Sequence, residues 1–344
     1  MTKLLEIRDK AIRFYGEYST YLFPVVKFIF ALVTFLLINA NIGYMMKISN
    51  PLIAIILALI CALLPVNGTI LLAAIVVLLD MYALSTEVAA VTAAVFLVIY
   101  FVYFRFAPKD GVVALLTPIC FVLKIPYAMP IGVGLIRKAY SFVAIICGTV
   151  VYFLIDGIRL NAAALTDSSA ETGQLSTKLN VGVGQVLGNK EMIMMIILLT
   201  LTTLVVYFVK RIRMDHAWTL AVVVGIVIQL LVGFVALLFL GTTSKALWLI
   251  IGVVLSGIIG FICEFLFMDL DYKRTERVQF EDDEYYYYVK AIPKKMISTE
   301  TKTVRHYGDT SSMGKRIPKQ NKDDVPVNSK GIVQELDIDE DLFK

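Results

Sequence analysis

The chain has 344 residues, of which 58% are hydrophobic and only 17% are charged, and its formal net charge is +4. A soluble domain carries about 25% charged residues, and several apolar runs here approach the ~20 residues that cross the hydrocarbon core of a bilayer. The composition excludes a soluble globular protein. We expect an all-α polytopic membrane protein whose main partner is the lipid bilayer, with no nucleic-acid partner.

The N-terminal segment divides into two parts. Apolar residues recur at helical spacing over residues 1–18, which predicts a short amphipathic helix at the membrane interface. The apolar run from Tyr21 to Ala40 is longer than the ~7–15-residue core of a signal peptide. We therefore predict a retained first helix over 20–40, at the start of a transmembrane domain that covers 19–270.

Further apolar runs predict the remaining spanning helices. The runs at 51–64 and 69–84 are short and are separated by the break PVNG, so we expect them to form a tight hairpin. Together with the first helix, the predicted spans make about eight: 51–64, 69–84, 87–104, 139–156, 191–209, 216–240 and 245–269.

The stretch 111–136 is apolar but contains Pro118, Pro126 and Pro130, with Lys124 near its middle. Proline interrupts helical hydrogen bonding. Each arm on either side of Lys124 reaches only about 20 Å, less than the ~30 Å hydrocarbon core. Broken backbone at membrane depth is tolerated when it is buried in protein or lines a wet cavity. We predict a re-entrant broken hairpin with Lys124 at its tip; two short spanning helices are the alternative.

The distribution of lysine and arginine favours a segment that enters and leaves on one side, because cytoplasmic loops are enriched in these residues. With such a segment, the loops and ends carry 14 basic residues inside and 5 outside. A single crossing would give 10 and 9. We therefore expect a multi-pass protein with both termini cytoplasmic and the polar segment 157–190 outside. The absence of a cleavable leader and of organelle signals fits the plasma membrane.

Lys124 is the sharpest candidate for function, because an ionisable group at this depth is costly and usually faces a partner or water. With the three prolines and Asp80, it forms a hypothetical substrate pathway. The alternatives are that Lys124 extends to the outer interface and that Asp80 is an interfacial residue near the end of its helix.

Two late helices carry small or polar residues at a spacing of four, which lets helices approach closely. We predict that the helices 216–240 and 245–269 pack along these faces and that Gln229 forms a hydrogen bond across them. The residues are Gly225, Gln229, Gly233, Gly252, Ser256, Gly260 and Glu264.

Catalysis finds little support in the sequence. The two histidines lie outside the apolar helices, and the HExxH and GxSxG motifs are missing. The four cysteines are far apart inside apolar runs, where they are typical buried residues. We expect no enzyme activity, no cofactor and no metal site.

The hydrophilic C-terminal segment predicts two regions. The tyrosines 285–288, with flanking Val and Phe residues, favour a juxtamembrane strand or β-hairpin over 271–297. Tyr285, Tyr286, Tyr287 and Tyr288 could dock a partner, form an interfacial tyrosine belt, or be purely structural. The polar segment 298–344 is typical of a disordered cytoplasmic tail.

Two functions remain open. A transporter or permease-like protein for a small, anionic or amphiphilic solute explains the broken hairpin and Lys124. A non-catalytic scaffold or accessory subunit of a cell-envelope complex explains the juxtamembrane strand and the long tail. A homo-oligomer or an envelope-complex partner fits either function.

Overall fold

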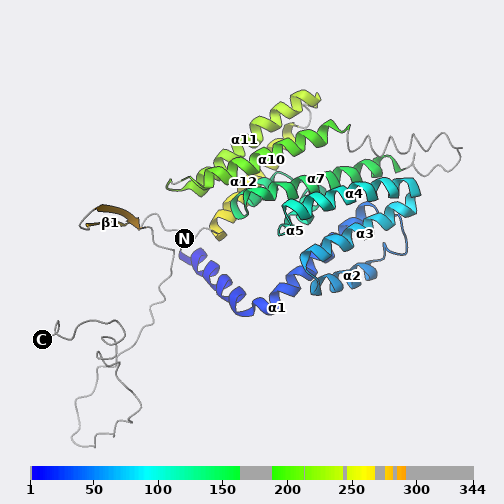
Figure 1. Ribbon diagram of the computed structural model, residues 1–344, viewed down its shortest axis with the longest axis horizontal. Helices are drawn as coiled ribbons and strands as arrows, with labels where there is room; N and C mark the ends of the chain where they lie inside the picture. Colours follow the sequence, from blue (N-terminus) through cyan, green and yellow to red (C-terminus); the bar gives the residue numbers. More distant parts are fainter. Residues whose placement is uncertain are drawn as a thin grey trace, which may run out of the picture. The chain divides into compact units, whose positions relative to one another are not determined.

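The computed structural model describes residues 2–162, 188–212, 214–242, 246–267, 276–281 and 285–291. The predicted tail 298–344 and most of the external segment 157–190 lie outside these residues. The elements are α1 (Thr2–Asn41), α2 (Pro51–Leu63), α3 (Val66–Leu84), α4 (Thr86–Phe106), α5 (Gly111–Val122), α6 (Ala128–Ile136), the 3-10 turn η1 (Ala139–Ser141), α7 (Phe142–Leu160), α10 (Lys190–Lys210), α11 (Ala217–Leu240), α12 (Ala246–Phe267), β1 (Glu276–Glu281) and β2 (Tyr286–Ala291) (Figure 1).

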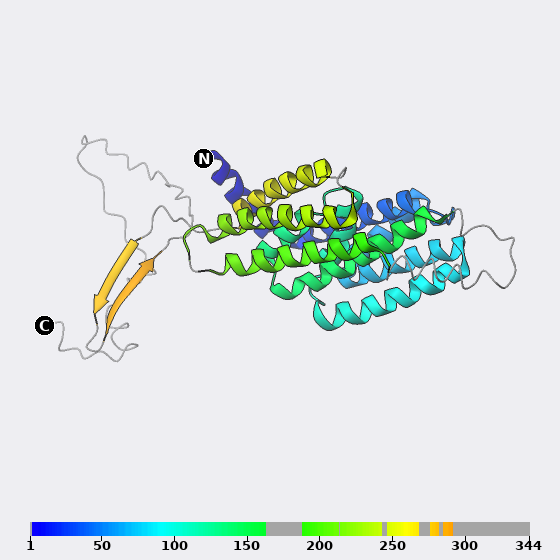
Figure 2. The same cartoon turned by 90° about the horizontal axis from the view of Figure 1, so that it is seen from above.

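Long apolar helices dominate the fold and lie side by side (Figure 2). Among the described residues, seven helices are long and apolar enough to cross a membrane, which makes the chain a multi-pass integral membrane protein. The eighth predicted span, α2, has only 13 residues, or about 20 Å. It stops because Leu64 precedes Pro65, which disfavours helical backbone there. Lys27 Nζ donates to the carbonyl of Leu64 at 3.0 Å and caps this end.

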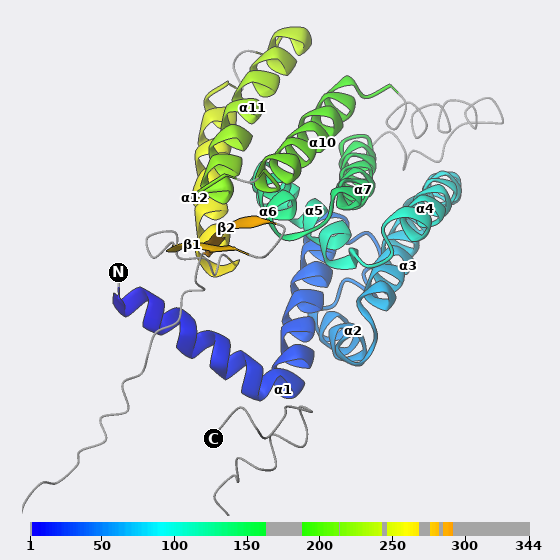
Figure 3. The same cartoon turned by 60° about the vertical axis from the view of Figure 1, so that its left-hand side comes forward.

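The first helix is bent where the sequence predicts a boundary. Tyr18 leaves helical geometry, with φ −102° and ψ 16°, and the two arms of α1 diverge in Figure 3. On the N-terminal arm, Arg8 is buried and its Nη1 donates to the carbonyl of Phe265 at 3.2 Å. A cation at the C-terminal carbonyls of a helix also interacts favourably with the helix dipole. The arm therefore ties the start of the chain to the end of α12.

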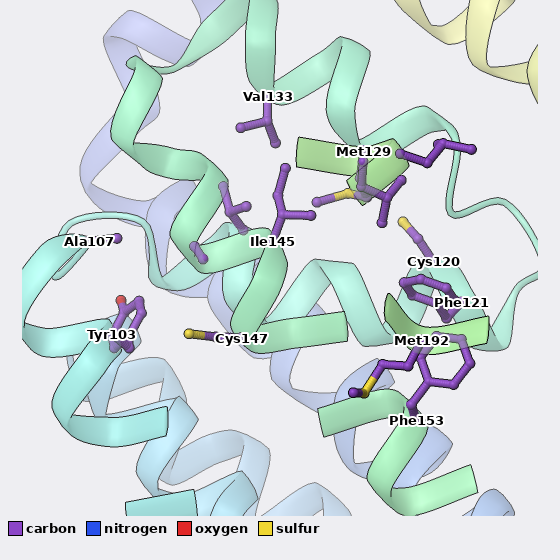
Figure 4. Close-up of a cluster of buried hydrophobic side chains, with 14 residues drawn as sticks. Tyr103, Ala107, Cys120, Phe121, Met129, Val133, Ile145, Cys147, Phe153 and Met192 are labelled. Atoms are coloured by element: carbon purple, nitrogen blue, oxygen red, sulfur yellow. The ribbon is translucent and has the colours of Figure 1, made fainter. Parts of the chain in front are cut away.

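The helices form two groups that meet at the broken segment. α5 packs mainly on α7 and also contacts α3 and α1, whereas α6 packs on α10 and α12. The two short helices thus lie in the middle of the bundle and belong to different groups (Figure 3). A buried cluster joins the groups, with Cys120 and Phe121 from α5, Met129 from α6, Phe153 from α7 and Met192 from α10 (Figure 4).

The juxtamembrane segment forms a two-stranded antiparallel hairpin. Its register pairs Glu276 with Ala291 and Glu281 with Tyr286. Residues 282–284, between the two strands, lie outside the described residues. An isolated hairpin of two strands is marginally stable in water.

α5 ends in a motif that normally requires glycine. The N–H of Ile125 donates to the carbonyl of Cys120 at 2.8 Å, and the N–H of Lys124 donates to that of Phe121 at 3.0 Å. These two bonds define a Schellman motif, whose residue after the cap is left-handed. That residue is Lys124, with φ 61°. The same motif ends α11, where Gly241 has φ 65°.

This pair of motifs generates a stability prediction. Because left-handed backbone costs an L-residue about 1 kcal/mol that glycine avoids, Lys124→Gly should be more stable than Lys124→Ala by about that amount. Both variants lose the lysine side chain, so their difference isolates the backbone. Gly241→Ala should lose a similar amount. The measurement is unfolding of the detergent-solubilised protein, and equal stability of the two Lys124 variants would contradict the assignment.

Candidate functional site

Both ends of the broken segment 111–136 meet at one end of the bundle. Asp110, just before α5, accepts a hydrogen bond from Ser141 Oγ at 2.7 Å, and its carboxylate lies 3.8 Å from Arg137 Nη1, just after α6. Lys210 Nζ, at the end of α10, donates to the carbonyls of Leu135 and Arg137 at 2.8 and 3.1 Å. We call this end of the bundle the foot end; the chain enters and leaves the segment there.

Lys124 lies in the connection between α5 and α6, toward the opposite end of the bundle. We call that end the far end. Asn41, at the end of α1, and Arg159, at the end of α7, lie there. Lys124 Nζ lies 5.6 Å from the ring centroid of Trp248, near the start of α12, within the range of a cation–π contact. Lys124 and Asp80 form no ion pair among the described residues: the Oδ1 of Asp80 accepts the Met45 N–H and its Oδ2 has no hydrogen-bond partner.

The three prolines have different surroundings. Pro118 lies inside α5 and has no N–H to donate to the carbonyl of Ala114. That carbonyl faces α7 at Gly148, where an added Cβ would lie 2.8 Å from it. Pro126 lies in the connection, and Pro130 is buried in the first turn of α6, where proline is tolerated. α5 therefore continues through Pro118, and the carbonyl that lacks a helical partner there lies close to α7.

A cavity of about 490 Å³ opens between α1, α3, α4, α5 and α7. Its lining is almost entirely apolar; of the predicted pathway residues, only Pro118 contributes to it. Lys124, Pro126, Pro130 and Asp80 do not line it. The volume lies within the ordinary range of small-molecule sites. The structure therefore separates the hollow part of the bundle from the tip of the broken segment.

Polar side chains gather at both ends of this cavity. At the far end, Arg159 forms an ion pair with Asp156 at 2.7 Å and donates to Asn41 Oδ1 at 3.2 Å. At the foot end, Tyr103 donates its hydroxyl proton to Asn67 Oδ1 at 2.9 Å. All five residues line the cavity. The cavity is thus apolar along its length and has polar groups at both ends.

The small residues of the late helices lie against more than one neighbour. At Gly233 an added Cβ would lie 2.3 Å from Leu249 of α12, so here α11 and α12 approach each other directly. At Gly252 it would lie 2.4 Å from the Tyr127 ring, just before α6. Gly225 and Gly260 make similarly close approaches, to Val206 of α10 and to Ile131 of α6. These faces therefore also receive α6 and α10, which the sequence did not indicate.

A polar node crosses the same interface. Gln229 is fully buried; its Nε2 donates to the carbonyl of Tyr127 at 2.7 Å, and its Oε1 accepts from Ser256 at 2.8 Å. Glu264, nearer the foot end, accepts a hydrogen bond from Thr219 of α11. The predicted packing set is therefore held together by hydrogen bonds as well as by close approach.

The tyrosines of the hairpin are partly described. Tyr285 and Tyr286 are 62% and 61% exposed, and Tyr287 is 39% exposed. The side chain of Tyr288 lies outside the described residues. Docking of a partner by these residues stays a prediction.

In the part of the chain that the structure describes, no three His, Cys, Asp or Glu side chains gather as candidate ligands for a metal ion. No family model, curated protein or solved structure matches the chain.

Sequence reasoning missed the residues that frame the site. Asp110 and Ser141 lie 31 positions apart, and their pairing has no local signal. Asp156 and Arg159 carried a weak one, because a spacing of three places two helical residues on one face. Trp248 at the start of α12 could have been noted as an aromatic near the level of the predicted tip.

At the foot end, the hydrogen bond between Asp110 and Ser141 should stabilise the fold more than the ion pair between Asp110 and Arg137. The Asp110 side chain is 4% exposed, whereas that of Arg137 is 42% exposed. Asp110→Ala leaves Ser141 without its acceptor and should lower the free energy of unfolding by about 1–3 kcal/mol. Arg137→Ala removes a long, exposed ion pair and should cost less than about 1 kcal/mol. Unfolding in the same detergent measures both; a larger loss in Arg137→Ala would contradict this ranking.

Proposed function

We propose that the protein is a membrane permease that binds an amphiphilic, lipid-like molecule in the cavity between α1, α3, α4, α5 and α7. The observation that carries the proposal is the cavity of about 490 Å³ with an apolar lining and polar ends. Apolar walls bind hydrocarbon without specific geometry, whereas a few polar groups orient the rest of a ligand. The proposed ligand is therefore an amphiphile with at least one hydrocarbon chain.

The polar ends give the ligand an orientation. Arg159 and Asp156 at the far end offer a donor and an acceptor to a headgroup, and Asn41 adds an amide. At the foot end, Asn67 and Tyr103 offer a second, uncharged polar contact. We propose that the headgroup enters at one end and leaves at the other while the chain stays among apolar side chains.

The broken segment supplies the movable wall in this proposal. α5 is only 12 residues long and contains Pro118, which lines the cavity. Because α5 and α6 belong to different helix groups, a displacement of one group against the other would change the distance between α5 and α7. Re-entrant entry of this segment and cytoplasmic termini rest on the distribution of lysine and arginine, and the proposal places the protein in the plasma membrane. Catalysis has no part in it.

The scaffold function remains the alternative. It is favoured by the exposed tyrosines Tyr285 and Tyr286 on the juxtamembrane hairpin, which would serve a protein partner rather than a solute. The cavity has no role in such a protein, and this difference separates the two functions experimentally.

Filling the cavity tests the proposal. Ala93 lines the cavity, and its neighbour on α4, Ala94, does not. Ala93→Trp should weaken binding of a doxyl-labelled fatty acid or lysophospholipid by about tenfold or more, because the indole occupies the space of the chain. Ala94→Trp should bind as the natural protein does. Electron paramagnetic resonance of the purified protein in nanodiscs gives the immobilised fraction of the probe.

Movement is measured separately. In vesicles, the reconstituted protein should move a fluorescent lysophospholipid to the inner leaflet. A membrane-impermeant reductant cannot quench the lipid there, so the protected fraction measures the movement. Ala93→Trp should abolish this protection and Ala94→Trp should keep it. Equal binding and equal protection in both variants would overturn the permease function; binding without movement would leave an amphiphile-binding protein that is not a permease.

A further inference from the structure

Asp80 is a buried acid, and one of its two carboxyl oxygens has no hydrogen-bond partner among the described residues. Its side chain lies on α3 and the residue is 0% exposed. Its Oδ1 accepts the backbone N–H of Met45 at 3.1 Å, and its Oδ2 has no hydrogen-bond partner. Within the described ranges, the carboxyl group therefore has one neutral donor and no paired cation.

The charged and titratable groups on the surrounding elements do not compensate it. On α7, Arg159 is bound to Asp156 and Asn41. On α4, Glu87 is another acid and accepts from Ser85. In the connection 42–50 between α1 and α2, the side chain of Lys47 is exposed.

Tyr44, in the same connection, interacts electrostatically with both Asp80 and Arg159. Burial raises the pKa of its phenol, the Arg159 charge lowers that pKa, and an ionised Asp80 would raise it further. Tyr44 is therefore an uncharged neighbour at neutral pH and gives Asp80 no counter-charge.

An isolated carboxylate in such surroundings is very costly, and a protein avoids the cost by neutralising the group or by admitting water. We propose that Asp80 is a proton-binding site, which holds a proton while the connection 42–50 covers it and releases that proton to water when the connection moves away. The bound form is the carboxylic acid and the released form is the carboxylate plus a hydrated proton.

The covering connection is closely fitted. Met45, whose N–H is held by Asp80, accepts at its carbonyl from the N–H groups of Ile48 and Ser49 at 2.9 and 3.0 Å. At Gly43, an added Cβ would lie 2.5 Å from the carbonyl oxygen of Asn39. There is little room for small adjustments, so exposure of Asp80 requires the connection to move as a unit.

That movement would reach the cavity. Ile42, the first residue of the connection, lines the far end of the cavity beside Asn41. The proton on Asp80 would thus control access to this end. The proton site itself does not depend on what the cavity carries, so it can stand or fall apart from the permease function.

Infrared difference spectroscopy of the full chain in nanodiscs tests the site. The spectrum of the natural protein minus that of Asp80→Asn at neutral pH should contain the carbonyl stretch of a protonated acid, which shifts in D2O and is lost as the pH rises. The matched control is Asp156→Asn, whose difference spectrum should contain carboxylate bands, because Asp156 is paired with Arg159. Carboxylate bands in the Asp80→Asn difference would overturn the proposal and make Asp80 an ionised structural cap.

Two further variants complete the test. Asp80→Glu keeps the proposal testable if Asp80→Asn does not fold, and Ile42→Cys tests the movement of the connection 42–50. Asp80→Glu should shift the acid band rather than remove it. Ile42→Cys, at a position 3% exposed, should react with a water-soluble thiol reagent increasingly fast at higher pH, relative to Met46→Cys at a position 92% exposed. Mass spectrometry reads each position. We expect the ratio of the reaction rate at Ile42→Cys to that at Met46→Cys to rise several-fold with pH when Asp80 is present. With Asp80→Asn, this ratio should not rise. A ratio that does not depend on pH in the presence of Asp80 would overturn the proposal that the proton controls the connection.

Discussion

The carboxylate of Asp110 holds the two ends of a broken helix together. It accepts a short hydrogen bond from Ser141 and faces the guanidinium of Arg137, so α5 must begin where α6 ends. The Ser141 bond is charge-assisted and buried, which makes it the stronger of the two contacts, while the exposed arginine contributes little. Both ends of the segment therefore lie together at the foot end.

This constraint divides the bundle into two groups with different interiors. Around α6, glycines on α11 and α12 let Tyr127 and Ile131 approach closely, and Gln229 ties three helices by hydrogen bonds. Around α5, the helices enclose a cavity instead. The dense group and the hollow group meet along α5, α6 and the contact between α7 and α10, where Phe153 and Met192 belong to one buried cluster.

The sequence predicts the coarse architecture well because it depends on local quantities. Run length gives the membrane helices, and Pro51 and Pro65 bracket the short α2. The distribution of lysine and arginine in the loops favours a segment that enters and leaves on one side. Asp110 and Arg137, which flank the segment, lie together at the foot end. The details depend on tertiary contacts. Lys124 occupies a left-handed position that no glycine marks, and the burial of Asp80 depends on a connection 35 residues away. The cavity is a property of five helices together, which no local pattern records.

The bond between Arg8 and the Phe265 carbonyl joins residues 257 positions apart. Domains emerge from the ribosome N-terminus first, at about 5–20 residues per second. The N-terminal arm of α1 is thus made first, yet its partner at the end of α12 is completed after all the other described helices. The arm can therefore dock on Phe265 only after α12 has been made. Docking of the arm follows the formation of α12 and is a late step in the assembly of the described helices.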